Sequence, residues 1–295
     1  MDAKLLQSRL LELIRRTSCE LPPDVKRAVD KGWRKEKTGT TAKYAFSVIR
    51  DNVILANDKS QPICQDTGTI ICYVDRPLWI SETDFRKAFE KAVVQATKVG
   101  YLRQNSVDSI TGKNSGTNLG PGSPTIHFHE TKAKTMTIRM MLKGGGCENV
   151  GIQYALPNTQ LGAGRDLEGV RRCVLDAVNK AQGKGCAPGA LGVCIGGDRA
   201  TGFANSKEQL LRTLDDKNDD KALAALEARV MKKANQLGIG PMGFGGKTTL
   251  LGCKIGMLNR LPASYFVSIS YMCWAFRRRG CLINATGKAT RWMYT

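Results

Sequence analysis

Three of the ten cysteines could provide a thiolate ligand: two lie in loops outside the periodic segments of the sequence, and the third lies near the end of a predicted strand. Cys64 lies in a polar turn, and Cys186 lies in a turn rich in glycine. Cys273 comes just before three consecutive arginines, whose positive charge favours the thiolate. Three such thiolates suit a metal ion or an iron–sulfur cluster. Their spacing alone assigns neither, and a cysteine taken singly is more often a small buried hydrophobic residue.

The two histidines do not provide a stronger metal site. His127 and His129 are two residues apart in a predicted strand, so their side chains point to the same face. The sequence places no third ligand beside them, and packing histidines are the favoured interpretation.

Two glycine-rich motifs resemble nucleotide-binding loops but fail on context. Residues 238–243 match GxGxxG, yet a predicted helix precedes them and a predicted strand follows, which reverses the dinucleotide-binding order. Gly246, Lys247 and Thr248 resemble the end of a phosphate loop, but Pro241 stands where the first glycine is required. What remains is a flexible turn with a lysine, suited to the approach of an anion.

The composition is that of a chain that buries a core. Of its 295 residues, 42% are hydrophobic and 24% are charged, which excludes extensive disorder. No uncharged stretch is long enough to span a membrane and no secretory signal is found, so we expect a cytoplasmic protein without disulfides. The net charge of +19 makes nucleic-acid binding a competing hypothesis. This charge is spread along the chain and only 6% of residues are aromatic, so no nucleic-acid partner is expected.

Hydrophobic periodicity predicts a helical N-terminal part over about residues 1–60, followed by mixed helices and mainly antiparallel strands. Helices are predicted at 2–17, 22–34, 39–56, 167–182, 204–214 and 219–237, and from a Ser81–Asp84 capping box to Val99. Strands are predicted at 67–74, 124–130, 134–142, 190–195, 248–258 and 265–276, with the second and third forming a pair. The irregular order of these elements predicts a single α+β domain over residues 1–295. The segment before the strand pair is a loop of about 20 residues, a length typical of functional loops.

Six motifs resemble, in order, the α subunit of the iron–sulfur (class I) fumarate hydratase and tartrate dehydratase family. They are ICQDTG, LRQNSVDSITGKNSG, KGGGCENVG, GKGCAPG, LGIGPMGFGGKTT and YMCWAFRRRG, and the match runs from about residue 10 to residue 281. The resemblance implies a [4Fe–4S] cluster held by three cysteines, with one iron free to bind substrate. By motif, the ligands are Cys64, Cys186 and Cys273. Cys147 occupies a position where relatives often have serine, and it is a candidate for a place near the site only.

The resemblance also implies residues that bind a C4 dicarboxylate. By motif these are Gln65, Asp66, Arg103, Gly146 and Lys247. Taken alone, each of them is an ordinary turn or surface residue. No general base is assigned within this chain, and we expect it on a partner chain.

The implied reaction is the reversible hydration of fumarate to malate in the tricarboxylic acid cycle, with conversion of tartrate to oxaloacetate as the alternative. Relatives have a second, smaller β domain, which we do not find in this sequence, so a separate β subunit and a dimer of αβ pairs are expected. Leu261 stands where relatives commonly carry a histidine before a Pro-Ala-Ser triplet. A weakly active relative is therefore a third interpretation.

Overall fold

The computed structural model describes residues 2–295, and the chain forms two compact units. The first unit contains the chain up to Pro23, Asp51–Gly145 and Ala275–Thr295, and the second contains Asp24–Arg50 and Gly146–Trp274. Each unit is assembled from separated segments, which is why no single linker in the sequence marks the division. Both units combine helices with sheets, and the predicted α+β class is confirmed.

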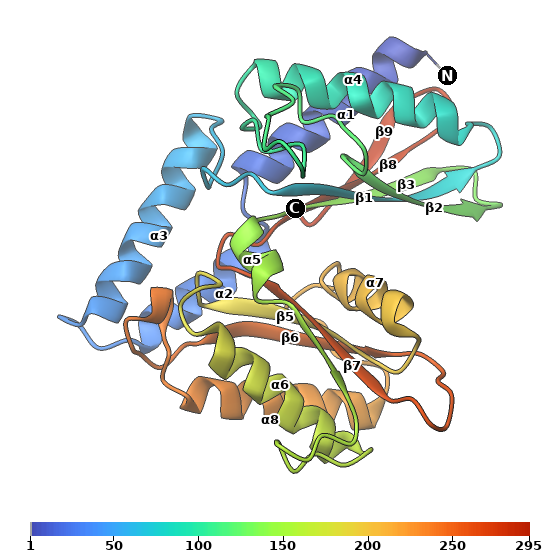
Figure 1. The fold of residues 1–295 in the computed structure, drawn as a ribbon. Coiled ribbons are helices and arrows are strands. Elements are labelled where there is room, and N and C mark those ends of the chain that lie inside the picture. The colour runs from blue at the N-terminus through green and yellow to red at the C-terminus, as the bar shows by residue number, and fades with distance from the viewer. Residues whose placement is uncertain (1) are drawn as a thin grey trace. The chain divides into compact units, whose positions relative to one another are not determined.

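The first unit contains a five-stranded sheet with the order β2-β1-β3-β8-β9 (Figure 1). The strands are β1 (Thr69–Pro77), β2 (Thr125–Thr131), β3 (Met136–Lys143), β8 (Arg277–Ile283) and β9 (Ala289–Met293). β1 pairs with β2 in parallel, and the β1–β3, β3–β8 and β8–β9 pairs are antiparallel. The starts of β1 and β8 therefore lie at the same edge of the sheet as the end of β3.

Two amphipathic helices of this unit, α1 (Ala3–Cys19) and α4 (Glu82–Lys98), lie on the same side of its sheet (Figure 1). Their apolar side chains share one buried core with the strands, including Leu10, Leu13, Phe85, Phe89, Val74 and Ile138. The predicted helix start at Ser81 is confirmed, because the Ser81 hydroxyl accepts a hydrogen bond from the Asp84 N–H at 3.0 Å.

The predicted pairing of the strands near 124–130 and 134–142 is wrong, although both strands exist. β1 lies between β2 and β3 and is hydrogen-bonded to each of them. Neighbouring strands are about 4.8 Å apart, so the connection over residues 132–135 crosses about 10 Å at the end of β1. A short connection does not prove a hairpin when a third strand occupies the central place.

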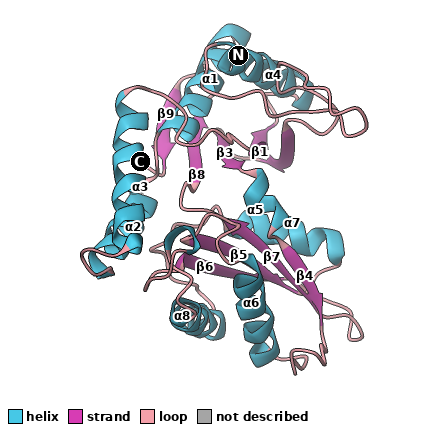
Figure 2. Ribbon diagram, turned by 60° about the vertical axis from the view of Figure 1, so that its left-hand side comes forward, coloured by secondary structure: helices cyan, strands magenta, loops and turns pink. Residues whose placement is uncertain are grey.

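The second unit contains a four-stranded sheet between helices, with the order β4-β7-β5-β6 (Figure 2). Its strands are β4 (Ile152–Ala155), β5 (Gly189–Ile195), β6 (Leu250–Met257) and β7 (Phe266–Met272). Helices α6 (Leu167–Ala181) and α8 (Lys221–Gln236) cover one face, and α7 (Arg199–Gln209) covers the other (Figure 1). α7 approaches closely because Gly192 has no side chain: a Cβ there would lie 2.0 Å from the Ser206 carbonyl oxygen.

The remaining elements are α2 (Pro23–Lys35), α3 (Thr41–Asp58), the short α5 (Gly145–Asn149) and a single 3-10 turn, Pro241–Gly243. The three helices predicted before residue 60 are thus confirmed. Among residues 2–295, no helix is long and apolar enough to cross a membrane.

Several boundaries differ from the sequence prediction, and two of them differ for a visible reason. α7 begins at Arg199 rather than near 204, because Asp198 caps it by accepting from the backbone N–H groups of Ala200 and Thr201. The strand predicted to continue to 276 ends at Met272, and a separate strand, β8, follows in the first unit. α5, β4, β8 and β9 were not predicted, since α5 and β4 are very short and β8 opens with three arginines.

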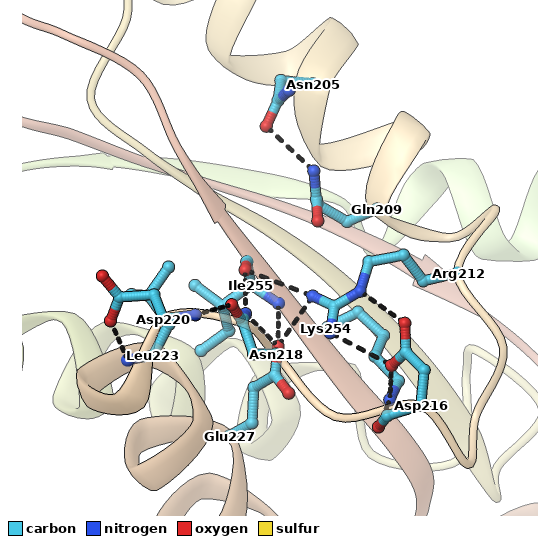
Figure 3. A network of polar contacts seen from close by, with 10 residues as sticks. All are labelled: Asn205, Gln209, Arg212, Asp216, Asn218, Asp220, Leu223, Glu227, Lys254 and Ile255. Atoms are coloured by element: carbon cyan, nitrogen blue, oxygen red, sulfur yellow. Dashed lines mark hydrogen bonds and ion pairs between the residues drawn. The ribbon is translucent and has the colours of Figure 1, made fainter.

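A buried polar network in the second unit fastens the connection between α7 and α8 to β6 (Figure 3). One carboxylate oxygen of Glu227 accepts hydrogen bonds from the Ile255 N–H at 2.7 Å and from Asn218 and Arg212 at 2.9 Å. Asp216 in turn bridges Arg212 and Lys254, whose side chain is only 6% exposed. Every member of the network has a charged or polar partner, which makes the loss of one partner costly.

Replacing Glu227 by alanine is expected to lower the free energy of unfolding by about 3 kcal/mol, because the half-buried Arg212 guanidinium, the Asn218 amide and the buried Ile255 N–H lose an acceptor. Urea denaturation of the full chain measures this. As the matched control, Asp30→Ala removes an acid whose ion pair with Arg50 is solvent-exposed, and it should cost less than about 1 kcal/mol. Equal losses for the two variants would contradict the assignment of Glu227 as a structural centre.

Candidate functional site

Cys186 and Cys273 meet at one end of the four-stranded sheet. β5 and β7 are antiparallel, with Ala190 opposite Met272, so the start of β5 lies beside the end of β7. Cys186 lies in the turn that leads into β5, and Cys273 directly follows β7. The Trp274 N–H donates to the Cys186 carbonyl at 3.3 Å. Two of the three cysteines predicted as ligands are thus brought together, although 87 residues of sequence separate them (273 − 186).

Cys147 joins this pair within the second unit. It is 3% exposed, and its Sγ accepts a hydrogen bond from the Cys273 N–H at 3.2 Å. The phenol of Tyr271 lies among the three thiols: its pKa is raised first by burial and then by the negative charge that Cys273, Cys147 and Cys186 carry when ionised. The expectation that Cys147 lies near the site is supported by these contacts.

Glycines shape the Cys186 turn around the Tyr271 ring. A Cβ on Gly189 would lie 2.2 Å from the Tyr271 Cζ, and one on Gly185 would lie 2.6 Å from Cε1, so neither position admits a side chain without displacing the ring. Cys186 itself has a positive φ of 53°, a conformation that is uncommon for residues other than glycine. The close packing against Tyr271 therefore requires glycine at two positions of the GKGCAPG motif, Gly185 and Gly189.

The glycine-rich turn that contains Met242 packs against the glycine-rich turn that contains Cys186. The Met242 N–H donates to the Ala187 carbonyl at 2.8 Å, and a Cβ on Gly183 would lie 2.6 Å from the Met242 carbonyl oxygen. α8 precedes this turn and β6 follows it, which confirms the reversed order on which the nucleotide-binding interpretation was rejected. The Lys247 side chain is exposed, while its backbone N–H donates to the Glu36 carboxylate at 2.8 Å.

The predicted substrate residue Gly146 also lies beside the Cys186 turn. A Cβ on Gly146 would lie 3.3 Å from the Lys184 carbonyl oxygen, a tighter distance than most Cβ contacts. The close approach explains why glycine suits this position.

In the first unit, Asp66 ties the turn that carries Cys64, Gln65 and Asp66 to two distant segments by hydrogen bonds. The Asp66 carboxylate accepts from the Gly145 N–H at 2.7 Å, and the Asp66 carbonyl accepts from Nη2 of Arg277 at 2.9 Å. These contacts form because the start of β1, the end of β3 and the start of β8 share one edge of the sheet. Cys64 and Asp66 are half-buried there, and Gln65 is exposed.

The long loop folds back onto the same turn. The Arg103 N–H donates to the Thr67 hydroxyl at 3.2 Å. Asn118, only 4% exposed, holds the loop by accepting from the Asn105 N–H at 2.8 Å and donating to the Arg103 carbonyl at 2.7 Å. The exposed Arg103 side chain is therefore anchored next to Asp66 through its own backbone.

Sequence reasoning did not single out Asn118, Tyr271 or Glu36. Each acts by holding the backbone of a distant segment, and a single sequence shows no such pairing. Tyr271 does fall within a quoted motif, YMCWAFRRRG, whereas Asn118 lies two residues beyond the loop motif that ends at Gly116.

Thiolates such as those of Cys186 and Cys273 are the usual ligands of iron–sulfur clusters. Among residues 2–295, no three His, Cys, Asp or Glu side chains are placed to share one metal ion. In a [4Fe–4S] cube each thiolate binds a different iron, so the sulfurs need not converge on one point. The predicted packing role is supported for His127, which stacks on Tyr73 with ring centroids 4.7 Å apart, whereas His129 is exposed and lies 3.7 Å from the Asp75 carboxylate.

Three other cysteines are unsuited to act as ligands. Cys72, Cys194 and Cys281 follow Cys64, Cys186 and Cys273 by eight residues each and have no measurable exposure. Burial raises the pKa of Cys194 and of Cys281 to about 12 and raises the pKa of Cys72 as well, so these thiols stay protonated at neutral pH.

Comparisons of the sequence with known proteins show which family it matches. The sequence matches the fumarate hydratase (Fumerase) family over residues 7–281. The chain belongs to this family.

Individual relatives fall into two groups. A putative class I fumarate hydratase from Geobacillus stearothermophilus is 50% identical over 99% of this chain, and the chain spans 57% of that protein's length. A putative L(+)-tartrate dehydratase subunit alpha from Methanocaldococcus jannaschii is 35% identical, with 91% of this chain and 94% of the relative covered. An L(+)-tartrate dehydratase subunit alpha from Escherichia coli is 30% identical over 91% of this chain and 87% of its own length.

Replacing Gly189 by alanine is expected to push Tyr271 away from the Cys186 turn and to lower the free energy of unfolding by about 1–3 kcal/mol. Alkylation of Cys186 by iodoacetamide, followed by peptide mass spectrometry, should become faster. Gly120→Ala is the control, because its Cβ would meet only the Ser106 Oγ at 3.7 Å. Unchanged labelling of Cys186 in Gly189→Ala would contradict the role given to the glycine.

Proposed function

We propose that this chain is the α portion of an iron–sulfur hydro-lyase that catalyses the reversible hydration of fumarate to malate. Membership of the fumarate hydratase family and the 50% identity to the Geobacillus stearothermophilus protein support this function. The observation that carries it is the meeting of Cys186 and Cys273 at one sheet end, around a buried tyrosine. Both cysteines lie in connections rather than in the core strands.

The proposed cofactor is a [4Fe–4S] cluster held by Cys64, Cys186 and Cys273. When bound, it supplies a Lewis-acidic iron with an open position, which polarises the substrate hydroxyl and eases its departure. The Cys273 N–H is directed at the Cys147 sulfur, and N–H groups at sulfur atoms are a means by which proteins tune such clusters.

The substrate of the proposed reaction is a dianion, and the proposed binding residues suit its two carboxylates. Arg103 and Lys247 supply positive charge, and Gly146 supplies a backbone N–H. Gln65 and Asp66 contact substrate or water from the turn beside Cys64. The Asp66 carboxylate is oriented by the Gly145 N–H at 2.7 Å, which fixes its position before substrate arrives. The general base is proposed to lie on the β portion.

A separate β subunit and a dimer of αβ pairs complete the proposed enzyme, which would serve the tricarboxylic acid cycle in the cytoplasm. Two relatives matched over 87% and 94% of their length are named as alpha subunits, which supports a separate β subunit.

Tartrate dehydratase is the second candidate function. The names of the relatives at 30–35% identity favour it, whereas the relative at 50% identity favours fumarate. A weakly active relative is the third candidate, because Leu261 replaces a histidine common in the family.

Single replacements of Cys64, Cys186 or Cys273 by alanine are expected to abolish assembly of the complete cluster and turnover of fumarate. The measurement is iron and sulfide content, visible absorption and malate formation after anaerobic reconstitution of the full chain with its β portion. The matched controls are Cys72→Ala, Cys194→Ala and Cys281→Ala, which remove buried thiols eight residues downstream. A fully active variant at any proposed ligand would sink the assignment.

Leu261→His tests the third candidate. Leu261 is 73% exposed in the connection before β7, and Cys273 follows the other end of that strand. A strand of seven residues (Phe266–Met272) is about 23 Å long, so we expect malate formation to change by less than about tenfold. Recovery of high activity in Leu261→His, from a nearly inactive parent, would show instead that this position limits turnover. Assays with L-tartrate in parallel decide between the first two candidates.

A further inference from the structure

The first residue of β8, Arg277, is a buried cation that has no ion-pair partner within residues 2–295. Arg277 is 1% exposed. Its Nη2 donates to the Asp66 carbonyl at 2.9 Å, while its Nε and Nη1 are buried and have no hydrogen-bond partner among residues 2–295. An arginine stays protonated at any physiological pH, and burying its charge is costly unless an anion lies close by.

Arg279, two residues further along β8, is also buried, and its charge is compensated by a carboxylate. Arg279 lies on the same face of the strand, is 4% exposed, and donates to the Glu20 carboxylate at 3.3 Å. Arg277 has no such carboxylate among the described residues. The one acceptor that it reaches is a neutral carbonyl, and this carbonyl belongs to the turn that carries Cys64 and Asp66.

The register of the sheet fixes this arrangement. Arg277 pairs with Leu142 near the end of β3, and Thr69 at the start of β1 pairs with Lys143. The guanidinium therefore reaches the Asp66 carbonyl, just before β1, from β8 on the other side of β3. A contact between residues 211 positions apart (277 − 66) constrains the turn in a way that its own sequence cannot.

We propose that Arg277 is a positioning residue of the hydro-lyase. Its guanidinium fixes the Cys64–Asp66 turn through the Asp66 carbonyl, and its buried positive charge offsets the negative charge of the group that binds at this turn. This inference rests on the proposed function for the identity of that group, the thiolate-ligated cluster with its dicarboxylate. The positioning itself concerns only contacts within the first unit.

Two substitutions separate geometry from charge. Arg277→Lys keeps the positive charge but loses the planar fork, whereas Arg277→Met loses both the charge and the hydrogen bond. Arg76→Met is the matched control: Arg76 also holds a backbone carbonyl, that of Ile80, at 2.7 Å, and its side chain is 14% exposed. Arg76 belongs to β1 but lies far from the Asp66 end of that strand.

The first measurement uses the metal-free full chain. Alkylation of Cys64 by iodoacetamide, read by peptide mass spectrometry, should be faster in both Arg277 variants than in the parent, and unchanged in Arg76→Met. Circular dichroism and urea denaturation establish that each variant is folded under the labelling conditions. If Arg277→Met does not fold, Arg277→Lys carries the test. Labelling of Cys64 at the parent rate in a folded Arg277 variant overturns the positioning role.

The second measurement uses the anaerobic holoenzyme with its β portion. Arg277→Met should shift the reduction potential of the cluster to a more negative value and raise KM for fumarate, since a nearby positive charge is lost. Arg277→Lys should keep the potential near that of the parent while kcat falls by about tenfold or more, because the turn is misplaced. A parental potential and parental KM in Arg277→Met overturn the charge-offsetting role.

The two measurements also separate this inference from the proposed function. Absence of a cluster in the parent enzyme would refute the proposed function, and the labelling of Cys64 would still decide whether Arg277 positions the turn.

Discussion

The antiparallel pairing of β5 with β7 is the constraint on which the candidate site depends. It brings the start of one strand beside the end of the other, and so places the Cys186 turn against the residue that follows β7. Tyr271, near the end of β7, fills the space under that turn, and Gly185 and Gly189 leave room for its ring. The two thiols are therefore positioned by backbone pairing and by one aromatic side chain, which is a more rigid support than a loop alone provides.

In the first unit, too, strand pairing brings together segments that are distant in the sequence. The ends of β1, β3 and β8 meet there, and the Asp66 turn takes hydrogen bonds from two of the segments that meet at this edge. The chain passes between the units at Gly145–Gly146 and at Trp274–Ala275, next in sequence to Cys147 and Cys273. The motif residues thus cluster where strands end and where the chain leaves a unit, positions that packing alone does not require to be cysteine, arginine or aspartate.

Local signals predicted the elements well where they were strong. The leucine periodicity of α1 and the capping residue of α4 identified both helices to within two residues. β8 escaped prediction because three consecutive arginines are not typical of a buried strand, whereas Arg277, Arg278 and Arg279 are all buried in the structure. The β2–β3 pairing was mispredicted because strand order is a property of the whole sheet. The division into two units left no mark, since both are assembled from separated segments.

The candidate site was predictable only in part from the residues themselves. Positions in loops or at the end of a strand singled out Cys64, Cys186 and Cys273 as thiols that could reach a ligand. The assignment of an iron–sulfur cluster came from resemblance to a family. The contacts that explain these positions join distant segments: Cys273 to Cys147, Asp66 to Arg277, and Arg103 to Thr67. Long-range pairing of this kind is fixed by the fold, and a single sequence does not show which distant residues are in contact.

The proposed enzyme binds one cube of iron and sulfide with a single iron open to substrate. This is tested by Mössbauer spectroscopy of the anaerobic, iron-57-loaded chain with its β portion. Adding fumarate or malate is expected to change the signal of one iron and to leave the signals of the other three unaltered. A cluster in which no iron signal responds to substrate, or a chain that turns over fumarate with no iron bound, would contradict the proposed cluster.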